Sequence, residues 1–328
     1  MYGDSLEKEE GEYVVYNNKK DERTSRYMEK DKMFLKAYGK INLALDVLRK
    51  REDGYHDVRM VMQTVGIYDG IEIEKTDTGE IEIETNIFFL PTNENNIVYK
   101  AVKMLFDEFH IKSGVRIYLK KFIPVAAGMA GGSSDAASVL FGINKMFQLG
   151  LSMRELMERG VKLGADVPYC LMRGTALSEG IGEKLQRLPD MIQCSVLIAK
   201  PPISVSTKFV YENLKLDEVE NHPDIDGMIK AISTGNLDGV ASKLGNVLEN
   251  VTVKEYPQIQ DIKNAMIEQN AINSLMSGSG PTVFGLFKTE KEAYEAKEAI
   301  KQSGLAKQVY VTDMFLPGRK NEGRYSNT

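Results

Sequence analysis

A glycine-rich junction constrains this chain more than any other stretch. It reads PVAAGMAGGSSDAAS, residues 124–138, and contains Gly128, Gly131 and Gly132. The apolar pattern of residues 136–147 after it predicts a helix. Bare backbone N–H groups and the positive end of a helix dipole both favour an anion at such a place. The junction therefore indicates a phosphate-binding loop, and the alternative is an ordinary turn with a serine or Asp135 as helix N-cap.

This loop differs from the two common nucleotide motifs. No Gly-Lys-Ser/Thr follows it, which excludes a Walker A loop, and no G-x-G-x-x-G follows a strand. The preceding GVRIYLKKFIP, residues 114–124, predicts a strand. The loop thus connects a strand to a helix, which is the context that phosphate binding needs.

The composition narrows the class of partner. A net charge of -5 over 328 residues provides no basic face for a nucleic acid, whereas a small anionic ligand needs only a local site. No apolar run approaches the length needed to span a bilayer, and no signal-peptide pattern opens the chain, so we expect a cytoplasmic protein with no membrane partner. Cys170 and Cys194 lie in apolar segments without metal-ligand spacing, which indicates buried thiols in a reducing compartment.

Residues 1–32 differ from the rest of the chain. They contain nine acidic and seven basic residues without a helical or strand period. This pattern predicts a disordered extension. The alternative is a regulatory or docking tail.

Lys40 stands beside Gly39 inside an apolar pattern, residues 34–50, that predicts a strand. Burying an unpaired ammonium group is costly. Either the lysine extends to solvent from an edge strand, or it has a buried partner. The strand pattern alone leaves both open.

A turn, REDGYHD, follows at residues 51–57 and carries Tyr55 and His56. An aromatic ring beside an imidazole can stack on a flat heterocycle and hydrogen-bond its edge. A Tyr-His pair can equally be ordinary surface. Asp166 poses a similar choice, because a carboxylate in a mainly apolar segment is either paired or catalytic, or it caps a turn before Pro168.

The remaining patterns predict an α+β protein with two domains, residues 33–190 and 191–328. We expect a β-hairpin over residues 71–85 and an amphipathic helix from residue 97, with Asn93 or Asn95 near its start. Capping boxes at Ser152 and Thr289 predict further helix starts. In the second half we expect helices over residues 225–232, 237–248 and 256–269, a short helix from Thr207, and a strand pair over residues 271–287.

Three motifs together resemble those of the GHMP small-molecule kinases, the superfamily of galactokinase, homoserine kinase, mevalonate kinase and phosphomevalonate kinase. They are AYGKIN at residues 37–42, the glycine-rich loop, and NSLMSGSGPTVFGLF at residues 273–287. Residues 53–56 (DGYH) and 163–168 (LGADVP) are similar to the branch whose acceptor is diphosphocytidyl methylerythritol, an intermediate of the non-mevalonate route to isoprenoids. The resemblance implies a two-domain fold, in which an amino-terminal domain like the second domain of ribosomal protein S5 precedes a ferredoxin-like domain.

The resemblance also implies the roles of site residues. Asp166 would take the proton from the acceptor hydroxyl, and Lys40 would hold the aspartate ionised. ATP would bind with Mg²⁺, whose ligands the sequence does not identify. The residues implied in ATP binding are Pro124, Val125, Ala126, Ala127, Gly128, Met129, Ala130, Gly131, Gly132, Ser133 and Ser134, with Asn95 near adenine.

On the acceptor side, the resemblance implies that Tyr55 and Tyr211 sandwich cytosine and that His56 hydrogen-bonds its edge. Asn42 and Thr207 would contact the same substrate. The implied partners are this small molecule and ATP, and the sequence sets no oligomeric state. Other GHMP kinases and a non-catalytic nucleotide-binding paralogue are the alternatives.

The loop departs from the family pattern at Met129 and Ala130, where leucine and glycine are usual. An extra methyl group at Ala130 is tolerable if its φ is negative and strained if its φ is positive. The first motif also lacks the usual proline, since Tyr38-Gly39 precedes Lys40. Neither change removes the lysine or Asp166.

Overall fold

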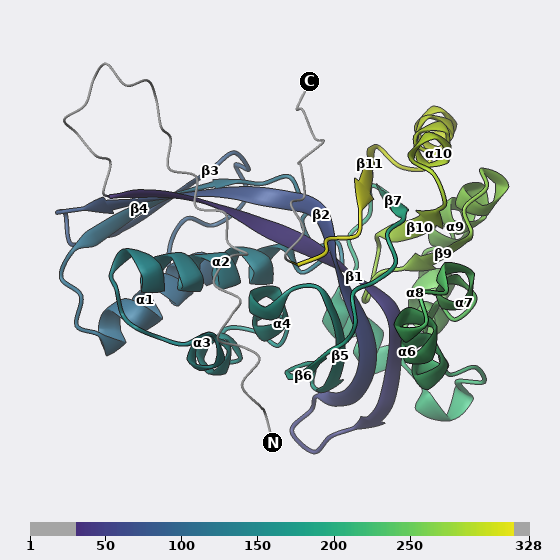
Figure 1. Cartoon of the computed structure of the whole chain (residues 1–328), viewed down its shortest axis with the longest axis horizontal. Helices are drawn as coiled ribbons and strands as arrows, with labels where there is room; N and C mark the ends of the chain where they lie inside the picture. Colours follow the sequence, from purple (N-terminus) through teal and green to yellow (C-terminus); the bar gives the residue numbers. More distant parts are fainter. Residues whose placement is uncertain (1–30, 318–328) are drawn as a thin grey trace. The chain divides into compact units, whose positions relative to one another are not determined.

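The computed structural model describes residues 31–317 (Figure 1). Contacts between Cα atoms divide the chain into two compact units. Among the described residues, unit 1 contains 31–39, 67–123 and 130–172, and unit 2 contains 40–66, 124–129 and 173–317. The predicted extension lies outside the described residues except for its last two positions, and Lys32 already belongs to the first strand. The predicted domain boundary near residue 190 stays a prediction.

Two long strands contribute residues to both units. They are β1 (Lys32–Lys50) and β2 (His56–Thr76), and the predicted turn joins them. In that turn the Arg51 N–H donates to the Tyr55 carbonyl at 2.8 Å, and Gly54 has a φ of 87°. A positive φ suits glycine, which explains why the chain reverses there.

In unit 1, β4 (Gly114–Lys120) pairs antiparallel with β2 and parallel with β3 (Ile81–Thr85). The predicted hairpin over residues 71–85 is therefore wrong, because β4 lies between its two strands. Each strand keeps its alternation of apolar and polar residues with either neighbour. For that reason the pattern identified both strands but not their partner.

The helices of unit 1 are α1 (Ile97–Glu108), α2 (Gly131–Met146), α3 (Met153–Gly160) and α4 (Val167–Met172). Asn96, rather than Asn93 or Asn95, caps α1 by accepting from the Val98 N–H at 2.9 Å. The predicted capping box at Ser152 is confirmed at α3. Helix α2 packs directly on the strands, since a Cβ atom at Gly142 would lie 2.7 Å from Ile73 Cδ1.

Unit 2 contains a four-stranded antiparallel sheet in the order β11-β7-β10-β9. Its strands are β7 (Ser195–Lys200), β9 (Asn273–Met276), β10 (Val283–Phe287) and β11 (Gln308–Asp313), so the predicted pair over residues 271–287 is confirmed. Elsewhere in unit 2, β5 (Thr175–Gly180) pairs with β2 and β6 (Lys184–Arg187), and β8 (Gly245–Asn246) pairs parallel with β1.

The helices of unit 2 lie largely between its strands in sequence. They are α5 (Thr207–Asn213), the short 3₁₀ helix η1 (Leu216–Glu218), α6 (Ile225–Ser233), α7 (Leu237–Ala241), α8 (Glu249–Glu255), α9 (Gln258–Glu268) and α10 (Glu290–Ser303). The predicted helix over residues 237–248 is too long, because the chain leaves α7 after Ala241 to form β8. Helices α9 and α10 flank the four-stranded sheet of this unit (Figure 1).

Both cysteines are buried, as predicted. Cys194 lies immediately before β7. Burial, with a smaller contribution from Asp313, raises the pKa of its thiol to about 12. A thiol with so high a pKa is chemically unreactive at neutral pH.

Candidate active site

The backbone of the glycine-rich loop alternates in conformation. Ala126, Gly128 and Ala130 have φ values of 50°, 69° and 55°, while the residues between them are not in the left-handed region. Alternating left-handed and right-handed residues turn successive N–H groups toward one side, which forms an anion-binding concavity. The loop has the alternation of φ that such a concavity requires, and its role in phosphate binding stays a prediction.

Ala130 has the positive φ that makes its methyl group a source of strain. It is also the residue before α2, and no side chain caps this helix. The helix begins at Gly131, so Ser133 and Asp135 lie within it and neither is the N-cap. The N–H groups of the first turn are thus left for water or a ligand, beside the positive end of the helix dipole.

The third motif supports the loop within unit 2. Ser277 Oγ donates to the Gly128 carbonyl at 3.0 Å, and a Cβ atom at Gly128 would lie only 2.1 Å from the Ser277 carbonyl oxygen. Glycine is therefore required at this position by both its φ and its neighbour.

Asn246 in β8 fixes the third motif in turn. Its side-chain amide donates to the carbonyls of Met276 at 2.9 Å and Gly278 at 2.7 Å, and its oxygen accepts from the Leu248 N–H. Asn246 is buried and all its hydrogen bonds are made inside unit 2. No sequence pattern marks Asn246, because an isolated asparagine in an apolar segment resembles any turn residue.

Asp166 lies in unit 1, one residue before α4. Its carbonyl accepts from the Cys170 N–H at 3.0 Å, while its carboxylate has no hydrogen-bond or ion-pair partner among the described residues of its own unit. A carboxylate that capped the turn would make such a bond. The capping alternative is therefore not supported, and the catalytic role of Asp166 stays a prediction.

The starts of three helices converge in unit 1 near Asp166. A Cβ atom at Gly164 would lie 3.8 Å from Ser133 Oγ in α2 and 4.0 Å from Ile97 Cδ1 in α1. Asn95, predicted near adenine, is exposed directly before the N-cap of α1. The loop's helical end, Asp166 and Asn95 thus belong to one region of unit 1.

Lys40 lies in unit 2 and is only 5% exposed, which excludes a lysine that extends to solvent. Its ammonium group donates to Asn42 Oδ1 at 2.6 Å, and its N–H donates to the Met129 carbonyl at 3.1 Å. Asn42 is thus oriented by Lys40. The predicted pairing of Lys40 with Asp166, which belongs to the other unit, stays a prediction.

Predicted substrate residues also gather in unit 2. The rings of His56 and Tyr211 lie 5.1 Å apart at 38°. Burial, and to a lesser extent the charge of Lys50, lowers the pKa of His56, so its imidazole is neutral at physiological pH. A neutral imidazole both donates and accepts, which suits the edge of a nucleobase.

Tyr55 is 60% exposed at the β1–β2 turn. Its N–H donates to Asp53 Oδ1 at 3.1 Å, and Arg51 bridges Asp53 and Asp57 at 2.8 and 3.1 Å. These contacts hold the turn and leave the ring accessible. At the start of α5, Thr207 shares a hydrogen bond of 2.8 Å with Ser279 of the third motif.

A buried cluster in unit 1 was missed by the sequence reasoning. Lys121 donates to the carboxylates of both Asp69 and Asp135. Burial, together with the charge of Asp69, raises the pKa of Asp135 to about 8 against the opposing charge of Lys121. Burial alone would lower the pKa of Lys121, but the two carboxylates raise it. The only signal was three charged residues in apolar surroundings, with nothing to pair them.

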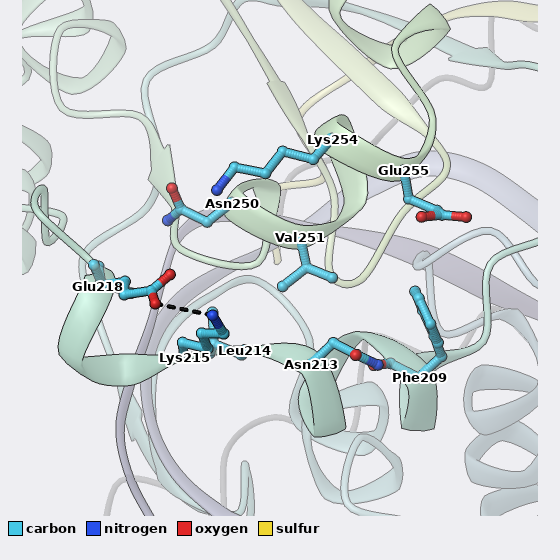
Figure 2. Close-up of a pocket in the computed structure, with 10 residues that line it drawn as sticks. Phe209, Asn213, Leu214, Lys215, Glu218, Asn250, Val251, Lys254 and Glu255 are labelled. Carbon is cyan, nitrogen blue, oxygen red and sulfur yellow. Dashed lines mark hydrogen bonds and ion pairs between the residues drawn. The ribbon is translucent and has the colours of Figure 1, made fainter.

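One cavity in unit 2, of about 300 Å³, lies between α5, η1 and α8, and none of the predicted site residues lines it (Figure 2). Phe209 and Val251 form apolar walls, and Lys215 pairs with Glu218 at 2.9 Å on its rim. Thr207 and Tyr211 share α5 with Phe209 but do not line this cavity.

Within residues 31–317, no group of three or more histidine, cysteine, aspartate or glutamate side chains is arranged to hold a metal. Nor does that part of the chain contain a helix that is both long and apolar enough to cross a membrane.

Family models match both halves of the chain. The model of the GHMP kinases N terminal domain matches residues 96–174, and the model of the GHMP kinases C terminal domain matches residues 228–306. A 4-diphosphocytidyl-2-C-methyl-D-erythritol kinase from Lachnospira eligens is 60% identical over 86% of this chain and 98% of its own length. One from Lachnoclostridium phytofermentans is 59% identical over 87% and 98%.

Solved structures of GHMP kinases have the same fold as this chain. A 4-(cytidine 5'-diphospho)-2C-methyl-D-erythritol kinase, 28% identical, superposes with a TM-score of 0.75 over 86% of this chain and 99% of that one. A homoserine kinase from Cytophaga hutchinsonii, 18% identical with a TM-score of 0.69 over 88% and 96%, shares the fold. The predicted α+β GHMP fold is confirmed, and the chain belongs to the 4-diphosphocytidyl-2-C-methyl-D-erythritol kinase family of the GHMP kinases.

Proposed function

We propose that this chain transfers the γ-phosphoryl group of ATP to the 2-hydroxyl of 4-diphosphocytidyl-2-C-methyl-D-erythritol, in the non-mevalonate pathway of isoprenoid biosynthesis. The observation that carries the proposal is the 60% identity to a kinase of that name over almost its whole length. The alternating backbone of the glycine-rich loop supports the ATP side. We place the reaction in the cytoplasm, in keeping with the buried thiols.

The phosphates of ATP would bind to the loop N–H groups and to the first turn of α2. Phosphoryl transfer gains most from positioning and from neutralising the charge that spreads over the phosphoryl oxygens. Mg²⁺ would arrive with ATP, and such an ion takes most of its ligands from phosphates and water. The protein would then supply no more than one or two oxygens, so a dedicated cluster of carboxylates is not needed.

Asp166 would act as the general base. The acceptor hydroxyl would give its proton to a carboxylate oxygen of Asp166 as the new O–P bond forms, while the bond between the γ-phosphorus and the β,γ-bridging oxygen breaks and ADP leaves. Lys40 would offset the negative charge that develops during the transfer. Its hydrogen bond to Asn42 Oδ1 supports this role, because it holds the flexible side chain in one orientation.

Cytosine recognition would use Tyr55 and Tyr211 as stacking rings and neutral His56 for the edge of the base. Asn42 and Thr207 would contact the same acceptor. The ring contact between His56 and Tyr211 supports this reading over a homoserine or mevalonate kinase, whose acceptors have no base to stack. An ATP-binding paralogue without activity would have no use for the unpaired carboxylate of Asp166 within unit 1.

The test measures ADP release from ATP with each of three acceptors in turn: the cytidyl acceptor, homoserine and mevalonate. We expect turnover with the first only. Asp166→Asn should lower kcat by about 10² to 10⁴-fold, the usual contribution of a general base. Tyr55→Ala should raise the KM for the acceptor at least tenfold while the KM for ATP stays within twofold, because a stacking ring is worth about 1–3 kcal/mol.

Asp107→Asn and Tyr294→Ala are matched controls, since both side chains are exposed on helices α1 and α10. They should behave like the wild type. Full activity of Asp166→Asn would remove the assigned base, and turnover with homoserine or mevalonate alone would overturn the proposed acceptor.

A further inference from the structure

The buried cluster of Asp69, Lys121 and Asp135 lies at the base of the glycine-rich loop. All three side chains are at most 5% exposed, and the lysine contacts both carboxylates. Asp69 Oδ1 also accepts from the N–H groups of Phe122 and Ile123, at 2.5 and 2.8 Å. Asp69 therefore fixes the backbone immediately before the loop.

The two ends of the loop meet above this cluster. A Cβ atom at Gly131 would lie 3.1 Å from Ile123 Cγ2 and 3.6 Å from Asp69 Oδ2. Residue 123 precedes the loop and residue 131 begins α2. Residues 124–130 thus form a loop whose closed base rests on Asp69.

Lys121 connects the two flanks of the loop. It belongs to the chain entering the loop, and Asp135 belongs to the second turn of the helix leaving it. A hydrogen-bonded ammonium group between two carboxyl groups fixes both the distance and the direction between these flanks. An apolar contact of the same size would fix neither.

Stability alone does not explain the cluster. Apolar residues of similar volume often stabilise a protein as well as a buried ion pair does, because the charges must be stripped of water. In addition, Asp135 Oδ1 is buried without a hydrogen-bond partner, which costs free energy. A cluster of this kind is better suited to defining a geometry.

We propose that Asp69, Lys121 and Asp135 are positioning residues that hold the two ends of the glycine-rich loop in the conformation that binds the phosphates of ATP. This inference rests on the proposed kinase function. These three residues would have no direct contact with nucleotide or acceptor. It acts through the direction of the loop N–H groups, so its loss should weaken ATP binding and spare the acceptor.

The experiment compares four variants of the full chain. Lys121→Met removes the bridge, and Asp135→Ala removes one anchor. Asp135→Asn is the conservative variant, because its amide oxygen still accepts from Lys121 while its NH₂ group replaces the unpartnered oxygen. Lys103→Met is the matched control, since Lys103 forms an exposed ion pair with Asp107 on α1.

Two quantities are measured for each variant: the Kd of a non-hydrolysable ATP analogue by titration calorimetry, and the KM of both substrates. We expect Lys121→Met and Asp135→Ala to weaken analogue binding about tenfold or more, equivalent to about 1.4 kcal/mol. The KM for the cytidyl acceptor should stay within twofold. Asp135→Asn and Lys103→Met should bind the analogue as the wild type does.

A purely structural role would give a different result. It would reduce the fraction of folded protein, and hence the apparent kcat and the number of binding sites, without changing either Kd or KM. That outcome would overturn the proposal, as would equal losses in Asp135→Asn and Asp135→Ala. If Lys121→Met fails to fold, the two Asp135 variants decide alone. Absence of turnover with unchanged analogue binding would instead count against the proposed acceptor.

Discussion

Gly128 meets two separate requirements at one residue, a φ of 69° and a backbone oxygen 2.1 Å from the position of any Cβ atom. Gly150 has a φ of 72° with nothing within 4 Å, so it isolates the first requirement. We expect Gly150→Ala to lower the free energy of unfolding by about 1 kcal/mol, from left-handed strain. Gly128→Ala should cost about 3 kcal/mol, because a backbone segment must also move.

Urea denaturation of the two variants measures the difference. Gly128→Ala should also weaken ATP binding, whereas Gly150→Ala should not. Equal losses of stability would show that the contact with the Ser277 carbonyl carries no cost.

Asp135 predicts a pH dependence of stability. Its pKa is about 8 in the folded chain and about 4 in an unfolded one, so folding favours the protonated carboxyl group. The stabilisation from this group is complete below the unfolded pKa and is lost as the pH rises from about 4 to about 8. The amide of Asp135→Asn cannot titrate, so this variant should not lose stability through residue 135 as the pH rises.

The free energies of unfolding of wild type and Asp135→Asn, measured in urea between pH 5 and pH 9, give the comparison. Their difference should shift in favour of the variant as the pH rises. Parallel curves would mean that Asp135 is ionised in the fold throughout this range.

Among the elements, β8 holds only two residues yet supports the third motif through Asn246. Asn246→Ala leaves the carbonyls of Met276 and Gly278 without these donors, and each buried unsatisfied group costs about 1–3 kcal/mol. We expect a loss of about 2–4 kcal/mol and lower kcat/KM, because Ser277 and Ser279 would no longer be held. Thermal unfolding and ADP release measure both effects.

Asn264→Ala is the control for that variant, since Asn264 accepts an exposed hydrogen bond from Gln260 on α9. It should change stability by less than about 0.5 kcal/mol. A similarly small effect for Asn246→Ala would contradict the supporting role of β8.

Element types followed from the sequence where periodicity and caps were local. The capping boxes at Ser152 and Thr289 fix the starts of α3 and α10, and alternation identified β2 and β3. The predictions that were wrong depended on contacts between residues that are distant in the sequence. Only the insertion of β4 separates β2 from β3, and pairing with β1 draws Gly245 and Asn246 out of a helical pattern.

The same division holds for the candidate site. The loop and the turn that carries Tyr55 were predictable because glycine placement determines local backbone conformation. The cluster of Asp69, Lys121 and Asp135 was not, since its members are up to 66 positions apart (135 − 69) and no local pattern pairs them. Asn246 was not predicted either, because the carbonyls that it binds lie 30 and 32 positions away in the sequence.

At the scale of the whole molecule, the chain passes between its two units five times, after residues 39, 66, 123, 129 and 172. A fragment of residues 191–328 therefore lacks residues 40–66 and 124–129 of unit 2. We expect this fragment and residues 33–190 each to be unable to form a stable core when expressed alone.

Near-ultraviolet circular dichroism and thermal unfolding of the two fragments test this expectation, with the full chain as reference. Neither fragment should show a cooperative transition. A cooperative transition in residues 191–328 would instead support the predicted boundary near residue 190 as an independent folding limit.

The high pKa of the Cys194 thiol has a practical consequence for spectroscopy. Maleimide and iodoacetamide reagents react with the thiolate, of which almost none exists at neutral pH when the pKa is about 12. Cys170 is shielded by burial. A cysteine introduced at an exposed position such as Lys208 on α5 would consequently accept a fluorophore at a single site, and the rest of the protein could keep its natural sequence during labelling.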